Sequence, residues 1–203
     1  VYSQVTQRFD SVTPDMEDPK ELKKFLELIR SLSAKGAILA YHDRSDGGLA
    51  AALCEMMFAS HVGVEIVADA LVSKDRTLNQ ALFNEELGAV IQVARGRAAE
   101  VERDFEAAGM GWSLKYLGNL TQDDHLNIYL EGKCVLSEDR VDLQKAWNEV
   151  SWQIARMRDN PECADSEYEL ISDKHNGGLV LTMGFDPEEN LAAPFINTGV
   201  RPK

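Results

Sequence analysis

The first 160 residues alternate between two hydrophobic periods, and this alternation constrains the fold more than any other feature. A helical period comes first, with apolar residues three or four positions apart at Leu22, Phe25, Leu26, Ile29 and Leu32. It predicts an amphipathic helix that starts after Asp18 and Pro19 and ends near Gly36. Residues 38–41 are apolar and too few for a helix, so they predict a buried strand.

The following segments continue this alternation as far as residue 160. Helix-forming composition or a helical period predicts helices at residues 49–60, 76–84 and 97–108. Short apolar and β-branched runs predict strands at residues 64–68, 89–94, 113–117, 126–130 and 134–137. Gly132 and Lys133 suit a hairpin turn between the last two strands. The order predicts an α/β fold of the mixed α+β type, with a mixed β-sheet flanked by helices.

A last helix is expected between Asp139, which can cap its first turn, and Pro161, which cannot continue its hydrogen-bond ladder. Its apolar stripe should pack on another surface and consists of Leu143, Trp147, Val150, Ile154 and Met157. Beyond this helix, several prolines, a pair of glycines and one expected strand at residues 179–183 indicate an extended connector. We therefore expect a domain at residues 1–160 and a linker at residues 161–203.

Charge and composition argue against several classes of function. With 34 acidic and 21 basic residues, the formal net charge is -13, which disfavours nucleic-acid binding. Charged residues interrupt the longest apolar stretch, so no membrane span is expected, and no signal peptide is visible. The cysteines are dispersed and odd in number, at Cys54, Cys134 and Cys163. This pattern fits a reduced cytoplasmic protein better than a disulfide framework or a zinc site.

A polar cluster from His42 to Gly48 joins the expected strand at residues 38–41 to the expected helix at residues 49–60. Unpaired N–H groups at a helix start commonly receive phosphate oxygens, and glycine lets the backbone come close. Asp43 could share a divalent cation with such phosphates, and Ser45 could donate its hydroxyl to one. The alternative is that Asp43 and Ser45 satisfy turn backbone groups while Asp46 caps the helix.

Two other polar features leave their roles open. His42 could act as a base or a ligand, but a histidine beside an apolar strand is more often structural. Glu85 and Glu86 follow Asn84 just before the expected strand at residues 89–94, and at most one of the two can face a site. On these grounds Glu86 could be functional or structural.

Four blocks of the sequence, in order, closely resemble phosphoribosylformylglycinamidine synthase in its large, single-chain form. The first three are residues 40–49, which contain the polar cluster, residues 82–90, and residues 158–164. The fourth comprises residues 192–196 with 198–199 and 201–203, and it resembles the approach to that family's glutaminase domain. Together the blocks span nearly the whole chain.

The resemblance implies that residues 1–160 form an AIR synthetase-like C-terminal domain, truncated at its N-terminus, and that residues 161–203 link it to a glutaminase domain. It implies a ligase of de novo purine biosynthesis that converts formylglycinamide ribonucleotide, ATP and glutamine into formylglycinamidine ribonucleotide, ADP, phosphate and glutamate. In that family a glutaminase triad beyond Lys203 would release the ammonia, so none of the cysteines here is its nucleophile. We expect no catalytic residue in this chain.

The resemblance also assigns two binding residues. In the large form an auxiliary site holds ADP and magnesium, and by resemblance Asp43 would be a metal ligand and Ser45 a nucleotide contact. The other ligands would come from a preceding synthetase domain. We therefore expect the remaining synthetase and glutaminase domains as partners, and half of a Mg²⁺ and ATP/ADP site that is inactive alone. The competing hypothesis is a non-catalytic scaffold or interaction domain with no nucleotide site of its own.

Overall fold

The computed structural model describes residues 1–8, 14–16 and 18–196. Contacts divide the chain into two compact units, Val1–Ser172 and Asp173–Lys203, and each is described separately. The expected division into residues 1–160 and 161–203 stays a prediction. Residues 198–203 of the fourth resembling block lie outside the described residues.

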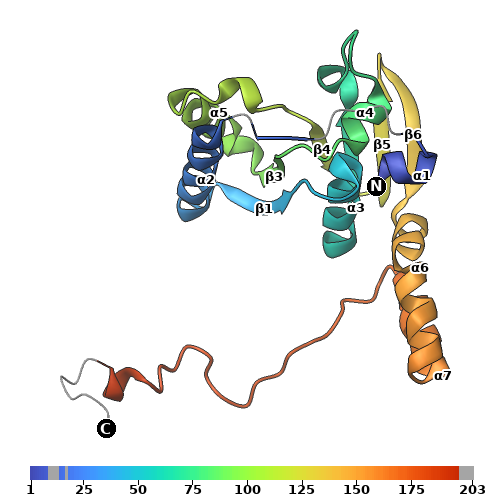
Figure 1. The fold of residues 1–203 in the computed structure, drawn as a ribbon. Coiled ribbons are helices and arrows are strands. Elements are labelled where there is room, and N and C mark those ends of the chain that lie inside the picture. The colour runs from blue at the N-terminus through green and yellow to red at the C-terminus, as the bar shows by residue number, and fades with distance from the viewer. Residues whose placement is uncertain (9–13, 17, 197–203) are drawn as a thin grey trace. The chain divides into compact units, whose positions relative to one another are not determined.

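The first unit alternates helices and strands, much as the sequence predicts (Figure 1). Its helices are α1 (Tyr2–Thr6), α2 (Pro19–Ala34), α3 (Gly48–Ser60), α4 (Leu78–Phe83), α5 (Ala98–Ala107), α6 (Arg140–Arg158) and α7 (Pro161–Glu169). Its strands are β1 (Ile38–Asp43), β2 (Gly63–Val67), β3 (Ala89–Val93), β4 (Gly118–Thr121), β5 (His125–Leu130) and β6 (Lys133–Asp139). Short 3-10 helices are η1 (Ala68–Leu71), η2 (Arg95–Arg97), η3 (Gly111–Ser113) and η4 (Leu170–Ser172).

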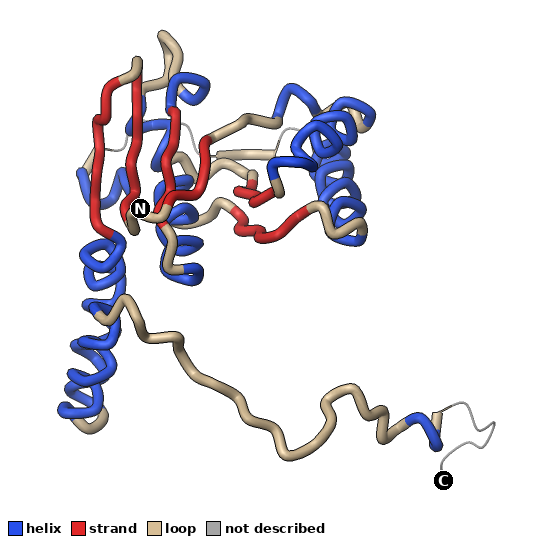
Figure 2. Tube along the Cα trace, turned by 180° about the vertical axis from the view of Figure 1, so that it is seen from behind, coloured by secondary structure: helices blue, strands red, loops and turns tan. Residues whose placement is uncertain are grey.

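The strands form two sheets, whose strands are red in Figure 2. The larger sheet has the order β4-β2-β5-β6, with β2 and β5 parallel and the other neighbours antiparallel. β1 and β3 form a two-stranded antiparallel sheet in which Asp43 lies opposite Ala89. The expected mixed α/β fold, with a mixed sheet and flanking helices, is confirmed.

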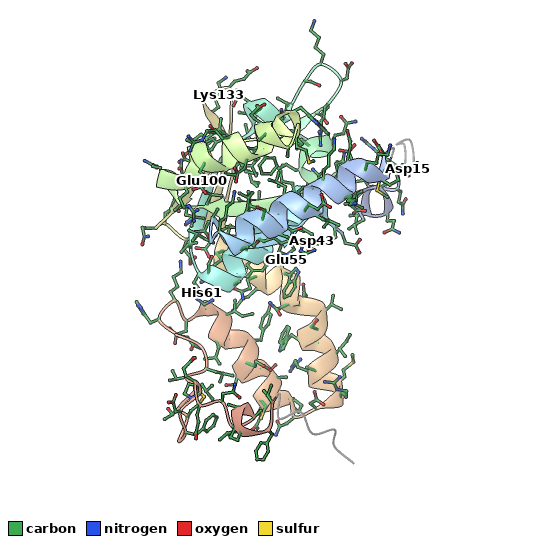
Figure 3. The ribbon with its side chains drawn as sticks, turned by 90° about the vertical axis from the view of Figure 1, so that its left-hand side faces the viewer. Asp15, Asp43, Glu55, His61, Glu100 and Lys133 are labelled. Carbon is green, nitrogen blue, oxygen red and sulfur yellow. The ribbon has the colours of Figure 1, made fainter. Side chains whose placement is uncertain are left out.

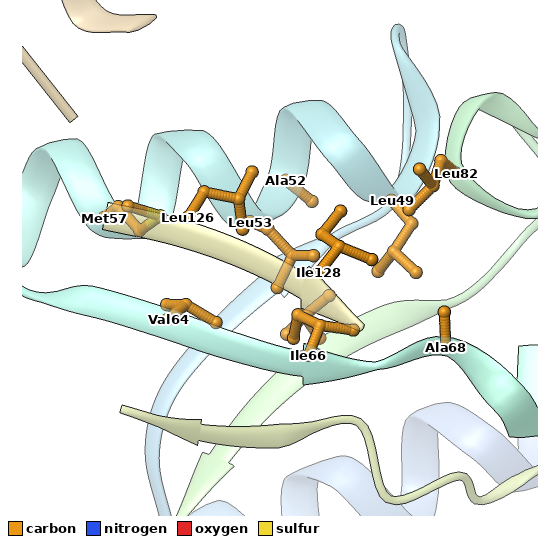
Figure 4. Close-up of a cluster of buried hydrophobic side chains, with 11 residues drawn as sticks. Leu49, Ala52, Leu53, Met57, Val64, Ile66, Ala68, Leu82, Leu126 and Ile128 are labelled. Atoms are coloured by element: carbon orange, nitrogen blue, oxygen red, sulfur yellow. The ribbon is translucent and has the colours of Figure 1, made fainter. Parts of the chain in front are cut away.

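The first hydrophobic core lies between α3 and the central strands β2 and β5 (Figure 4). Leu126 and Ile128 are two residues apart on β5, so both side chains point to the same face of the sheet, toward α3. The buried members of this core are Leu49, Ala52, Leu53, Met57, Val64, Ile66, Ala68, Leu82, Val90, Leu126 and Ile128. The core therefore ties α3, which begins beside the polar cluster, to the larger sheet.

A second core packs α2 and α5 together with the β1–β3 sheet. Leu28 and Leu32 lie four residues apart on α2 and present one apolar face, as the helical period predicts. The buried members are Leu28, Leu32, Ala37, Val101, Phe105 and Met110, with Ile38, Ile91 and Val93 of the two strands packed against them. This core holds β1, which carries Asp43 at its end.

Polar side chains cap the N-termini of α6 and α7. The Asp139 carboxylate accepts a hydrogen bond from the backbone N–H of Val141 at 2.7 Å, which confirms the expected cap. α6 ends before Pro161, also as expected. Asn160 then accepts a hydrogen bond from the backbone N–H of Glu162 at 2.9 Å and opens α7, with Pro161 as its first residue. Proline suits that position because the first N–H of a helix has no intrahelical partner. The helix α7 was not predicted from the sequence.

Three expectations about strands are wrong. The strand at residues 38–41 is not buried, because one face of its two-stranded sheet is uncovered, and Leu39 and Tyr41 are 60% and 42% exposed. Residues 113–117 form the end of η3 and a loop, and β4 starts only at Gly118, where pairing with Ile66 begins. In the second unit residues 179–183 form no strand, since no described strand pairs with them. The described part of that unit contains one short 3-10 helix, η5 (Ala193–Phe195).

The apolar stripe of α6 is largely uncovered, which contradicts the expectation that it packs. Only Leu143 joins the first core, and the ring centroid of Trp147 lies 5.8 Å from that of Phe58. Val150 and Met157 are 70% and 80% exposed. The reason is that α7 packs on a different face of α6, through Trp152 stacked on Tyr168 with ring centroids 4.2 Å apart.

Within residues 1–8, 14–16 and 18–196, none of the helices meets the length and hydropathy that a bilayer span requires.

Shortening a buried side chain of the first core should lower the free energy of unfolding. Ile128 is 0% exposed, so Ile128→Ala should lower the free energy of unfolding by about 2–5 kcal/mol, because it removes buried methylene groups and leaves a cavity. Val135→Ala, on the neighbouring strand β6 at a position that is 47% exposed, is the matched control and should cost less than about 1 kcal/mol. Urea denaturation followed by circular dichroism measures both. Equal losses would contradict the assignment of the core.

Candidate functional site

The polar turn, residues 43–48, ends in a backbone shape that favours glycine. Gly47 and Gly48 have φ values of +79° and +67°, in the left-handed region that other residues rarely adopt. The Gly48 N–H donates a hydrogen bond to the Ser45 carbonyl at 2.9 Å and closes the turn. A Cβ on Gly48 would lie 2.7 Å from the carbonyl carbon of Phe83 and from the carbonyl oxygen of Asn84. The turn therefore lies directly on the backbone at the end of α4.

Arg44 fastens the polar turn to the facing segment, residues 83–88. Its Nε donates to the Glu86 carbonyl at 2.7 Å and its Nη2 to the Leu87 carbonyl at 3.1 Å. Its backbone N–H donates to the Gly88 carbonyl at 2.8 Å. Burial lowers the pKa of Arg44, and the nearby Glu86 charge opposes that shift. Three consecutive carbonyl groups of the facing segment thus accept hydrogen bonds from this one residue.

Asp46 does not cap α3, and Glu85 binds the backbone just before the helix. The N-cap residue is Gly47, which has no side chain, and its N–H donates to Glu85 Oε1 at 3.1 Å. The alternative in which Asp46 caps the helix is therefore wrong, because the N-cap residue is Gly47 and no side chain forms a cap hydrogen bond there. The hydrogen bond from Gly47 lowers the pKa of Glu85, and a hydrogen bond from the Val1 ammonium lowers it further.

Asp43 and Ser45 both have exposed side chains, on either side of the half-buried Arg44 (Asp43 is labelled in Figure 3). The backbone of Asp43 is held in β1 opposite Ala89. Burial raises the pKa of Tyr41, and the negative charge of Asp43 raises it further. Within the described residues, neither the Asp43 carboxylate nor the Ser45 hydroxyl forms a hydrogen bond or ion pair. Both groups are thus open to a ligand, although their role as ligands stays a prediction.

His42 has a structural explanation. Its Nε2 lies 2.8 Å from Glu55 Oε2, and its Nδ1 lies 2.6 Å from the carbonyl oxygen of Asp43. Glu55 Oε1 in turn accepts a hydrogen bond from Trp147 Nε1 at 3.2 Å. The histidine therefore connects β1 to α3 and, through Glu55, to α6. Both ring nitrogens are engaged, so we assign it no catalytic role.

Glu86 makes only long contacts through its carboxylate. Glu86 Oε2 lies 3.9 Å from Arg44 Nη2 and 4.0 Å from Arg76 Nη2, and its side chain is 53% exposed. Exposed ion pairs at such distances contribute little to stability. Its clear contribution is the backbone carbonyl that Arg44 binds.

A broad cleft of about 2850 Å³ runs along β1, β3 and the facing segment. It is far larger than the roughly 300–1,000 Å³ typical of small-molecule pockets, so it is an open surface rather than a closed ligand cavity. Asp43 and Arg44 line it, whereas Ser45 is not among the described residues that do. The structure therefore brings only one of the two predicted binding residues to the cleft.

The exposed carboxylate of Asp43 is the group of the polar turn that chemistry allows as a magnesium ligand. No group of three or more His, Cys, Asp or Glu side chains in the described part of the chain is arranged to hold a metal. Magnesium commonly takes only one or two carboxylates from protein, with phosphate oxygens and waters as its other ligands. The free carboxylate of Asp43 suits that role. The described residues alone do not form a complete metal site.

The cysteines show no arrangement for nucleophilic catalysis. All three are free thiols. Cys54 is partly buried, and burial together with the Glu55 charge raises its pKa to about 11, which opposes thiolate formation. Cys134 and Cys163 are exposed and lie on different elements, β6 and α7.

The contacts of Arg44 and Glu85 were not predicted from the sequence. Their partners lie 42 and 38 residues away in the chain, so no local pattern identifies them. The available signal was the concentration of polar residues in two separate segments, each next to a predicted strand. That signal indicates that the segments could meet, but not which atoms make contact.

Comparison with known proteins shows the family of this chain. Residues 1–131 match the family described as AIR synthase related protein, C-terminal domain. The solved structure of Thermotoga maritima PurL complexed with FGAR aligns with a TM-score of 0.55 and 16% identity, over 63% of this chain and 21% of that chain. The same protein complexed with ATP aligns with a TM-score of 0.54 and 16% identity, over 62% of this chain and 22% of that chain.

A third structure is phosphoribosylformylglycinamidine synthase II from Thermotoga maritima, with a TM-score of 0.54 and 16% identity, over 62% of this chain and 22% of that chain. At such low identity, the likeness to these structures establishes the fold alone. The chain spans only 21–22% of the length of those proteins. The family match and the fold together confirm the expected AIR synthetase-like C-terminal domain.

The pKa of Tyr41 should report the negative charge of Asp43. Asp43→Asn should lower the pKa of Tyr41 without restoring the ordinary value, because burial is the larger cause of the shift and remains. Asp46→Asn makes the same charge change three residues further along the turn and is the matched control. Titration of ¹³C-labelled tyrosine rings by NMR measures both variants. If the pKa of Tyr41 is the same in Asp43→Asn as in the unmodified protein, the placement of the carboxylate is wrong.

Because backbone atoms of residues 83–84 lie so close to Gly48, a residue with a Cβ at this position should strongly lower the free energy of unfolding. Gly132 has a similar φ of +72° but nothing within 4 Å of its would-be Cβ, so it isolates the conformational cost. Gly132→Ala should lose about 1–2 kcal/mol of unfolding free energy. Gly48→Ala should lose clearly more, because its Cβ would also meet backbone atoms at 2.7 Å. Urea denaturation compares the two, and a smaller loss for Gly48→Ala would contradict the contact with α4.

Proposed function

Because the chain belongs to the family of AIR synthase related proteins, as their C-terminal domain, we propose that it is part of a phosphoribosylformylglycinamidine synthase. In this proposal it belongs to the large, single-chain form of that ligase, which uses ATP and glutamine to make formylglycinamidine ribonucleotide in the cytoplasm. Residues 1–160 are the last AIR synthetase-like domain and residues 161–203 the linker to a glutaminase domain. The ordered sequence blocks described above support this more specific assignment.

The role of the chain in that enzyme is to supply one side of an auxiliary Mg²⁺ and nucleotide site. Asp43 binds the metal ion and the Ser45 hydroxyl donates to a phosphate oxygen. Bound magnesium would offset part of the negative charge of the diphosphate. The remaining ligands come from another synthetase domain, and ammonia comes from the glutaminase domain. The chain therefore carries no catalytic residue and is inactive alone.

One observation carries this proposal more than any other: the Asp43 carboxylate is exposed at the end of β1, and no described residue neutralises or binds it. An unpaired carboxylate beside a rigid turn is available to a hard cation. It lies within the residues that match the family. The Thermotoga maritima PurL structures with ATP and with ADP make a nucleotide ligand a reasonable candidate for a relative of that fold.

A second candidate function is a scaffold domain without a nucleotide site. Glu85 favours it, because its carboxylate already occupies the Gly47 N–H at the start of α3, where a phosphate oxygen could otherwise bind. The net charge of -13 also opposes the approach of a free diphosphate. Under this hypothesis Asp43 and Ser45 are only exposed turn residues. The isolated chain would then show no Mg²⁺-dependent nucleotide binding, even when mixed with the preceding synthetase domain.

The two candidates differ in the effect of Asp43→Asn on the full-length protein. We expect this variant to lose bound ADP and magnesium, with an affinity loss at least as large as the roughly 10- to 100-fold that outer-shell changes cause at metal sites. Asp46→Asn removes an equal charge from the same turn and should retain the nucleotide. Chromatography of nucleotide released from purified protein, with metal analysis, gives both contents. Unchanged ADP content in Asp43→Asn would reject the metal assignment and favour the scaffold.

A further inference from the structure

We propose that Arg44 is a positioning residue for the nucleotide site, an inference that rests on the proposed function of Asp43 and Ser45. Its guanidinium binds the backbone of the facing segment, and this attachment fixes the two neighbouring residues in the geometry that a metal-bound diphosphate requires.

The donors of Arg44 are directed inward, at backbone carbonyl groups. Nε and Nη2 donate to the carbonyls of Glu86 and Leu87 at 2.7 and 3.1 Å, and the side chain is only 18% exposed. The would-be Cβ of Gly88 lies 3.2 Å from Nη2 and 3.5 Å from Cζ, so the guanidinium packs closely on that glycine. Two of the three guanidinium nitrogens are therefore bound to backbone carbonyl groups, as expected for a residue that positions its neighbours.

The chain on either side of Arg44 transmits this constraint. Exposure alternates along the segment, with Asp43 and Ser45 exposed and Arg44 half-buried between them. Asp43 is the last residue of β1, and Arg44, whose side chain is turned toward the facing segment, lies between two residues with exposed side chains. Asp43 is also held by pairing with Ala89, and the Ser45 carbonyl by the N–H of Gly48. Arg44 is the middle attachment of the three.

Arginine suits this position better than lysine. The guanidinium is planar and presents several donors in a fixed fork, so one side chain can bind two successive carbonyl oxygens. Lysine has a single nitrogen on a flexible stem and cannot reproduce both contacts with the same geometry. Arg44→Lys therefore keeps the positive charge and removes the fork. Any loss of binding in this variant reports on geometry rather than on charge.

The test compares Arg44→Lys with Arg76→Lys in the full-length protein. Arg76 Nη2 also faces Glu86 Oε2, at 4.0 Å, but among the described residues the Arg76 side chain donates no hydrogen bond to a backbone carbonyl. We expect Arg44→Lys to raise the Kd for Mg²⁺-ADP about tenfold at a temperature where far-UV circular dichroism matches the unmodified protein. Arg76→Lys should bind normally. Isothermal titration calorimetry gives the Kd, and the electron paramagnetic resonance spectrum of Mn²⁺ in place of Mg²⁺ reports the geometry around the metal.

A purely structural role for Arg44 would lower the melting temperature and leave both the Kd and the Mn²⁺ spectrum of the folded protein unchanged, and that result overturns the proposal. If Arg44→Lys does not fold, Gly88→Ala decides instead. Its Cβ would press on the guanidinium at 3.2 Å, and no residue of the polar turn is itself substituted. Weaker binding in Gly88→Ala supports the positioning role, and unchanged binding rejects it.

Asp43→Asn, measured in parallel, separates failure of this inference from failure of the proposed function. If Asp43→Asn loses Mg²⁺-ADP and Arg44→Lys does not, only the positioning role is wrong. If Asp43→Asn binds Mg²⁺-ADP normally, the proposed nucleotide site is wrong, and the positioning role fails with it.

Discussion

The polar turn keeps its shape because the backbone of the facing segment lies directly against it. Gly48 has no Cβ to separate the two, and Arg44 binds three successive carbonyl groups across the contact. These contacts also supply hydrogen-bond donors to three carbonyl groups of a segment that pairs with none of the described strands. The directions of Asp43 and Ser45 depend on this attachment, and so does the start of α3.

The charges around the turn explain why the chain supplies only part of a site. Two nitrogens of the Arg44 guanidinium donate to carbonyl oxygens, and the Gly47 N–H donates to Glu85. The Asp43 carboxylate and the Ser45 hydroxyl form no hydrogen bond or ion pair within the described residues. A chain with a net charge of -13 that presents a free carboxylate attracts a cation before it attracts a phosphate. A diphosphate would thus bind here together with a metal ion and with groups from another domain.

Most helices could be predicted from the sequence, because the apolar residues that a helix buries recur locally, as in α2, and because caps such as Asp139 lie within the same few residues. Strands were less certain, because a strand exists only where a partner pairs with it. Residues 113–117 have suitable composition, yet pairing with β2 begins at Gly118. Residues 179–183 have no partner among the described strands. The exposed apolar stripe of α6 was also unexpected. The helical spacing of its apolar residues shows that the helix has an apolar face, but it does not show which element covers that face.

The sequence by itself determined the mixed α/β class, the order of helices and strands, the glycine-rich turn between β1 and α3, and Asp43 and Ser45 as its candidate ligands. It could do so because propensity, period and turn chemistry act over a few residues. Only the tertiary structure decided that Glu85 binds the Gly47 N–H at the start of α3, that Arg44 binds the backbone of the facing segment, and that Asp43 lines the cleft. Those contacts join residues about 40 positions apart, and packing of the two cores, rather than any local preference, brings them together.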